Sequence, residues 1–132
     1  MVELHGWLTV EETYADEDLL PEHEQRRIAE AVRGIIAESG LVPEYVNGAC
    51  FLRALYCGNH RTPQVDAVIE CFRRVAETAS GSYGMIHLRD DEDAVSGNAF
   101  QVWVFRRGAC IQRADTDFSP CIPVIEDAAA VH

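Results

Sequence analysis

The first ten residues alternate between apolar and polar side chains, and this pattern constrains the fold more than any other part of the chain. On an extended backbone, one side carries Val2, Leu4, Gly6, Leu8 and Val10. A strand with one apolar face must pack that face against another layer of structure. Trp7 falls on the opposite, mainly polar side, where we expect it to pack across neighbouring strands, with a binding role as the alternative.

Two later segments have apolar residues at helical spacing and can supply that second layer. The first helix is expected from about Pro21 to Ser39, with Gly40 in place for a left-handed cap. The second opens at Thr62-Pro63, where a capping hydroxyl precedes a proline suited to the first turn. Its apolar face comprises Val65, Val68, Ile69, Phe72, Val75 and Ala76. This face is interpreted as core.

The remaining apolar runs are short and are separated by turn signals, which is typical of strands. Leu41–Val46 contains Pro43 and is therefore expected at a sheet edge. Asn47-Gly48 then predicts a tight hairpin, because both central positions of a type I′ turn need positive φ. Further strands are expected at Ala49–Cys57, Tyr83–Arg89, Ala99–Arg107 and Cys110–Arg113, the last two joined at Arg107-Gly108.

The predicted order is therefore β-α-β-β-α-β-β-β, in which the first six elements have the ferredoxin-like order. This predicts an α+β two-layer sandwich: an antiparallel sheet with two helices on one face, extended by a C-terminal hairpin. The 132 residues fit one domain. From about residue 115, Pro120 and Pro123 oppose both helix and central strand, so an extended tail is expected.

Charge narrows the classes of partner. The chain has 22 acidic and 11 basic residues and a net charge of −11, and every basic residue is arginine. Residues 1–25 contain no basic residue at all. Nucleic-acid binding is disfavoured because phosphate contacts need a basic face. An acidic protein is instead suited to a basic partner, whose approach it accelerates.

Segment lengths and cysteines indicate the compartment. No apolar run approaches the ~20 residues that a membrane span needs, and the first residues lack the basic start of a secretory signal. We therefore expect a soluble, cytoplasmic protein that does not bind membranes. The five cysteines are odd in number and scattered, so reduced thiols are expected rather than a disulfide framework.

Two patterns suggest metal or catalytic chemistry, and neither is complete. The acidic run Asp90–Asp93 lacks the alternating ligands, central glycine and distant glutamate of a calcium loop. Cys57 and His60 form half of a zinc site without the other half. They also form a conceivable nucleophile and base, which spacing alone cannot establish. No metal or cofactor is predicted, and the residues favour a binding module over an enzyme.

Nine segments resemble, in order and over nearly the whole chain, the Immunity protein 7 family of bacterial polymorphic toxin systems. They are His5-Gly6-Trp7, Asn47-Gly48, Gly58-Asn59-His60-Arg61, Gly81-Ser82-Tyr83-Gly84, Arg89–Asp93, Asn98–Val102, Arg107-Gly108, Asp117–Pro123 and Ile125–Asp127. The resemblance implies a small cytoplasmic α+β protein that binds and neutralises the toxin C-terminal domain encoded beside it.

Charge and resemblance together suggest how such a toxin would be bound. Many of these toxins are nucleases, whose clefts are basic because they hold phosphate, so an acidic inhibitor can occupy the cleft. The hypothesis is an acidic surface with aromatic anchors. Its expected partner-binding residues are Trp7, Tyr83, Arg89, Asp90, Asp91, Glu92, Asp93, Asp115, Asp117, Phe118, Glu126 and Asp127. The alternatives are a small-ligand or metal-binding regulatory domain and, less favoured, a Cys57/His60 enzyme.

Overall fold

The computed structural model describes residues 1–14 and 19–118 and contains six strands and two helices within them. In chain order these are β1 (Val2–Val10), α1 (Glu22–Ser39), β2 (Glu44–Val46), β3 (Ala49–Gly58), α2 (Pro63–Thr78), β4 (Tyr83–Asp90), β5 (Phe100–Arg106) and β6 (Ala109–Ala114). The predicted element order is therefore confirmed, and the chain has an α+β fold.

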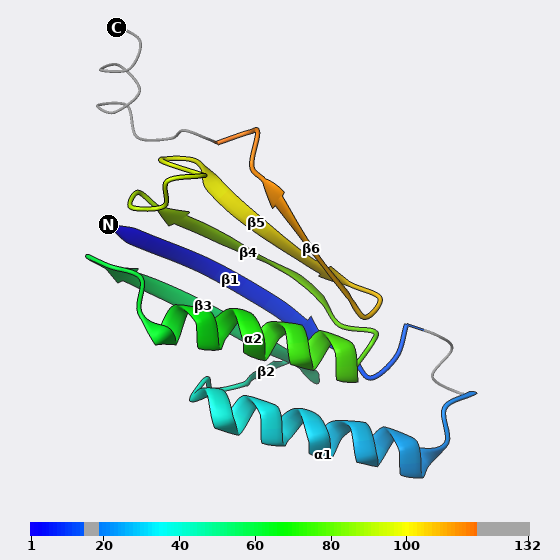
Figure 1. The fold of residues 1–132 in the computed structure, drawn as a ribbon. Helices are drawn as coiled ribbons and strands as arrows, with labels where there is room; N and C mark the ends of the chain where they lie inside the picture. Colours follow the sequence, from blue (N-terminus) through cyan, green and yellow to red (C-terminus); the bar gives the residue numbers. More distant parts are fainter. Residues whose placement is uncertain (15–18, 119–132) are drawn as a thin grey trace, which may run out of the picture.

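All six strands belong to one antiparallel sheet in the order β2-β3-β1-β4-β5-β6 (Figure 1). The first four strands have the ferredoxin-like arrangement, in which β1 lies between β3 and β4. The hairpin β5–β6 extends the sheet beyond β4, as the sequence predicts. β1 is one of the four strands that have a neighbour on both edges, and its apolar alternation suits this place because one of its faces is buried against the second layer.

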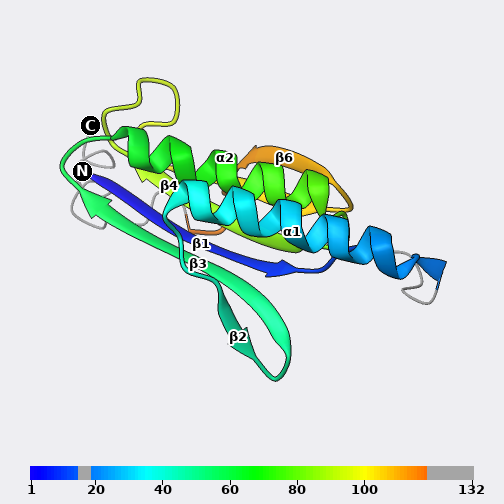
Figure 2. The same cartoon turned by 90° about the horizontal axis from the view of Figure 1, so that it is seen from below.

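Both helices lie on one face of the sheet, which forms a two-layer sandwich (Figures 1 and 2). The face of β1 that carries Leu4 and Leu8 is buried beneath them. Phe72 of α2 meets Phe105 of β5 edge to face, with ring centroids 5.8 Å apart. The apolar face predicted for α2 is buried apart from Ile69, which is half-buried. The core thus lies between the sheet and the two helices.

Several boundaries differ from the sequence prediction. β2 begins at Glu44 and not at Leu41, because Pro43 has no backbone N–H for a strand ladder. The first helix begins at Glu22, with Pro21 at its N-cap position. β5 begins at Phe100, since Ala99 donates its N–H to the Ser96 carbonyl in the preceding loop. The predicted tail lies mostly outside the described residues.

The glycine-bracketed segment Gly81–Gly84 leads into β4 where β4 meets β1. A Cβ at Gly84 would lie 2.1 Å from the Trp7 carbonyl oxygen, and one at Gly81 would lie 2.3 Å from the Thr13 carbonyl oxygen. Between them the buried Ser82 hydroxyl accepts the Glu11 N–H at 3.1 Å. These two glycines allow the backbone approach that joins β4 to β1.

Candidate partner interface

The predicted partner-binding residues gather in two places on the sheet. Val2 pairs with Asp90 and Thr9 pairs with Tyr83, so the acidic run lies at one end of β1 and the two aromatic residues lie at the other. We call the first place the acidic end: Asp90–Asp93 with Asp115–Phe118. Along β4, Tyr83 lies seven residues from Asp90, which at about 3.3 Å each places the aromatic pair roughly 23 Å from the acidic run at most.

The predicted partner-binding residues that follow β6 are held at the acidic end by one backbone hydrogen bond. Asp115 donates its N–H to the Phe100 carbonyl at 2.9 Å, which places the residues after β6 beside the loop between β4 and β5. The Asp115 carboxylate then accepts the N–H groups of Asp117 and Phe118 in a tight turn. Phe118 is exposed there. Glu126 and Asp127, also predicted, lie outside the described residues.

Asp93 stabilises the loop between β4 and β5. Its carboxylate accepts the Val95 N–H at 2.9 Å, the Ser96 hydroxyl at 2.9 Å and the Gln101 amide at 2.8 Å. These bonds, the Val95 N–H above all, hold the pKa of Asp93 below its ordinary value. The main structural role of Asp93 is therefore to order this loop.

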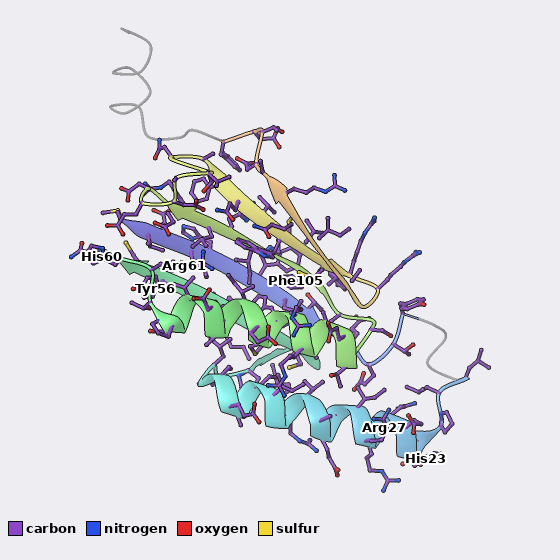
Figure 3. The ribbon with its side chains drawn as sticks, in the orientation of Figure 1. His23, Arg27, Tyr56, His60, Arg61 and Phe105 are labelled. Carbon is purple, nitrogen blue, oxygen red and sulfur yellow. The ribbon has the colours of Figure 1, made fainter. Side chains whose placement is uncertain are left out.

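The other three acids of the run differ in how available they are. Asp90 is buried and accepts the Glu92 N–H. Asp91 pairs with the Met1 ammonium at 2.6 Å, and this hydrogen bond lowers the pKa of Asp91. Glu92 is more than half exposed and contacts His60 Nδ1 at 2.8 Å (His60 is labelled in Figure 3). Glu92 and Asp91 are thus the members of the run that a partner can reach.

Arg89 lies beneath the acidic end rather than on it. Its side chain is only 4% exposed, and its guanidinium lies 3.9 Å from Glu3 and 3.5 Å from the Asn98 side-chain oxygen. Among the residues that the structure describes, the Nε of Arg89 has no hydrogen-bond partner. Arg89 therefore offers a partner no direct contact in this conformation, and it balances the charge of the acids around it.

Trp7 and Tyr83 form an exposed aromatic pair on the face of the sheet away from the helices. Their rings meet edge to face with centroids 6.3 Å apart, and the two residues are 45% and 47% exposed. The expected cross-strand packing of Trp7 is confirmed by this contact. Nearly half of each residue nevertheless remains exposed, as an interface anchor requires.

Sequence reasoning missed a second apolar surface, which lies at the β2 edge of the sheet. It consists of Val42, Tyr45, Val46 and Leu55, which are between 59% and 76% exposed, and we call it the hairpin patch. Tyr45 faces the helices, whereas Val46 and Leu55 lie on the other side of the sheet. The sequence does contain a signal for this surface. β2 and β3 carry apolar residues at successive positions, and because successive side chains of a strand point to opposite faces, some of these residues must lie outside the core.

A groove separates α1 from the edge of the sheet beside this patch. It encloses about 540 Å³. Its walls are mainly aliphatic: Val10, Ile28, Val32, Ile36, Leu41, Val42 and Tyr45 among others. Burial in this wall raises the pKa of the Cys50 thiol. Glu12 and Arg33 provide one charge of each sign. The groove suits an apolar group better than a charged one.

His60, considered with Cys57 as a metal ligand or catalytic base, lies beside the acidic end of the sheet. His60 contacts Glu92, and its carbonyl accepts the Tyr56 hydroxyl at 3.1 Å (Figure 3). Within residues 1–14 and 19–118, no group of three His, Cys, Asp or Glu side chains is arranged to hold a metal ion. In the same residues, no helix combines the length and apolar character needed to cross a membrane.

Comparison with known proteins identifies the family. Searches of curated proteins and of solved structures give no match. The family model described as Immunity protein 7 matches residues 1–127, which is almost the entire chain and includes both candidate surfaces. The chain therefore belongs to the Immunity protein 7 family.

Proposed function

We propose that this protein binds the C-terminal domain of a bacterial polymorphic toxin encoded beside it and neutralises that domain in the cytoplasm of the producing cell. Membership of the Immunity protein 7 family supports the general role. The observation that carries the mode of binding is the collection of carboxylates at one end of a protein with net charge −11. Such an end suits a basic toxin surface, as in the cleft of a nuclease.

Differences in burial favour some of these side chains over others for the proposed contact. Asp90 and Arg89 are buried, and Asp93 orders its own loop, so these three support the surface from beneath. Glu92, Asp91 and Asp117 remain exposed enough to face a partner. Charges at the rim of an interface mainly accelerate association and set partner choice, whereas buried aromatic groups slow dissociation. Trp7 and Tyr83 are the aromatic groups proposed for that second role.

Co-expression tests the general role. The toxin domain is expressed in bacteria with and without this protein, and we expect growth only where both are present. Equal killing in the two strains would refute the immunity function.

Association kinetics test the charge contribution separately. The association rate of the purified proteins should fall as salt is raised, because salt screens exposed charges. A double change, Glu92→Gln with Asp117→Asn, should lower the rate several-fold at low salt and leave it nearly unchanged at high salt. Glu30→Gln with Glu22→Gln is the matched control, because these exposed carboxylates lie on α1, away from the acidic end. Equal effects of both pairs would show that only net charge matters.

A further inference from the structure

We propose that two copies of this protein pair with each other along β6, antiparallel and about a twofold axis, so that their two sheets become one. The inference goes beyond the proposed function and does not depend on the toxin. β6 is the last strand in the sheet order, and within residues 1–14 and 19–118 it pairs with β5 alone (Figure 1). A sheet edge of this kind offers backbone groups to another strand.

The two edges of the sheet differ in how open they are to pairing. β2, at one edge, has three residues and follows Pro43, and both features oppose the addition of a strand. β6, at the other edge, has six residues and contains no proline. Every residue of β6 is exposed except Ile111, which is half-buried. β6 is therefore the edge at which a further strand can add.

The backbone groups of β6 that point away from the sheet follow from its pairing with β5. Asp115 donates its N–H to the Phe100 carbonyl at 2.9 Å. In an antiparallel ladder, successive residues direct their N–H and C=O alternately toward the two sides of the strand. Since Asp115 faces β5, Cys110, Gln112 and Ala114 face outward. Each of these three residues presents one N–H and one C=O group to a second strand.

A second copy of β6 fits this edge in a register that uses all of these groups. Gln112 then lies opposite Gln112 of the second copy, and Cys110 lies opposite Ala114 on each side of the axis. Each such pair exchanges two hydrogen bonds, about six in all. The twofold axis is perpendicular to the sheet, so equivalent side chains stay on the same face and the helices of both copies lie on one side.

Charge at the two ends of β6 matches this register. Arg106 and Arg107 precede the strand and are exposed, whereas Asp115 and Asp117 follow it. With Gln112 at the centre, Arg107 of each copy lies opposite Asp117 of the other, so a pair of opposite charges flanks the strands at each end. A parallel arrangement would place like charges together. The charges therefore favour the antiparallel pair.

Charge also distinguishes a second copy from the toxin as the occupant of this edge. Residues 99–114 contain three arginines and no acidic residue, in a chain of net charge −11. The toxin surface proposed above is basic, and a basic strand would meet these arginines as like charges. The β6 strand of a second copy carries the complementary order of charges on an otherwise acidic molecule. The occupant that fits is therefore a second copy of the chain.

Mass in solution tests the pairing. The full chain is sedimented over a range of concentrations in about 0.15 M salt, where a Debye length of about 8 Å limits the repulsion between two acidic copies. We expect a monomer–dimer equilibrium. Gln112→Pro removes the central outward N–H from both copies, and it should raise the dimer dissociation constant at least about tenfold.

Gln112→Thr is the matched control for this change. It loses the same side chain but keeps the N–H, so the dimer dissociation constant should remain near that of the wild type. Urea unfolding checks that both variants are folded.

An exchange of charges tests the register. Arg107→Asp or Asp117→Arg alone sets like charges opposite each other and should weaken the dimer several-fold. The two changes together restore opposite charges and should return the dissociation constant to near the wild-type value. Arg107 has φ of 48°, a conformation that aspartate tolerates, so the turn is preserved. A double variant weakened as much as both single changes combined would overturn the proposed pairing.

The outcomes are independent of the proposed function, because none of these measurements uses the toxin. A wild-type protein that stays monomeric at every concentration would overturn the inference, whether the edge is open or is covered by residues 119–132 of the same chain. A dimer that withstands Gln112→Pro would show that the copies meet on another face, and it would also overturn the inference. A protein that dimerises through β6 but fails to neutralise the toxin would refute the proposed function alone.

Discussion

Gly84 faces the backbone of Trp7 so closely that a Cβ on Gly84 would lie 2.1 Å from the Trp7 carbonyl oxygen and 2.8 Å from Leu8 Cα. Both contacts are with backbone atoms of the neighbouring strand, which cannot rotate aside as a side chain would. β1 and β4 therefore keep their register only with glycine at this position. β1 also exposes the Trp7 side chain to solvent. The close packing of Gly84 on Trp7 therefore holds in place a residue that is proposed to bind the partner.

Gly84→Ala should consequently lower the free energy of unfolding by more than about 2 kcal/mol, because the strands must separate to admit a methyl group. Gly34→Ala, in α1, is the matched control: apart from its own stretch of helix, none of the described residues has an atom within 4 Å of the Gly34 Cβ position. There the same change should stabilise the protein by up to about 1 kcal/mol, since alanine favours helix. Urea unfolding of both variants checks the contrast, and equal effects would contradict it.

Trp7→Ala should weaken toxin binding by about tenfold or more while leaving the fold intact, since nearly half of the residue is already exposed. Trp103, the other tryptophan, is buried, so a change in fluorescence on binding should come from Trp7. Titration with toxin should shift the emission to shorter wavelength as water is excluded from the ring. Trp7→Phe should abolish the shift, and its persistence would place the contact elsewhere.

Asp93→Asn should remove part of the acid sensitivity of the protein. The pKa of Asp93 is lowered in the folded state by the Val95 N–H and the Ser96 hydroxyl, so its stabilising effect is present above the unfolded pKa, about 3.9. That effect is lost as pH falls through the lower, folded pKa. Urea midpoints at pH 7 and at pH 2.5 should differ less in the variant than in the wild type. An unchanged difference would contradict the role assigned to Asp93.

The thiols should react at very different rates. Cys57 is exposed, whereas Cys71 is only 3% exposed within α2 and burial raises the pKa of its thiol. Less thiolate and less access both slow alkylation. Brief treatment with a maleimide at pH 7, followed by peptide mass spectrometry, should label Cys57 and leave Cys71 unmodified until denaturant is added. Early labelling of Cys71 would show that α2 opens readily from the sheet.

Local patterns predicted the elements of the fold, because their causes lie in neighbouring residues. Asn47 and Gly48 have φ of 51° and 78°, and Arg107 and Gly108 have φ of 48° and 77°, as two-residue hairpin turns require. The start of β2 was misplaced because its apolar run begins before Pro43. Pro43 has no N–H for the strand ladder, and this missing donor decides the boundary in the structure although the apolar run extends beyond it.

The candidate interface was less predictable, because exposure depends on which strands lie at the edge. The acidic run appears uniform in sequence, yet Asp90 is buried while Glu92 is exposed. The partner of Asp91 is the chain terminus, 90 residues away. Leu55 resembles a core residue until the sheet order places β3 beside a three-residue edge strand. None of these contacts follows from spacing along the chain.

The position of β1 between β3 and β4 also affects when the sheet can form during synthesis. β1 is made first, but one of its two partners is β4, and the pairing of Val2 with Asp90 spans most of the chain. Such distant contacts carry a large loop-closure cost and slow folding. A growing chain therefore cannot pair β1 on both edges until β4 has left the ribosome, and β5 and β6 are added after that. Under the proposed function, toxin binding could begin only after that delay, so synthesis of this protein would have to start before active toxin appears.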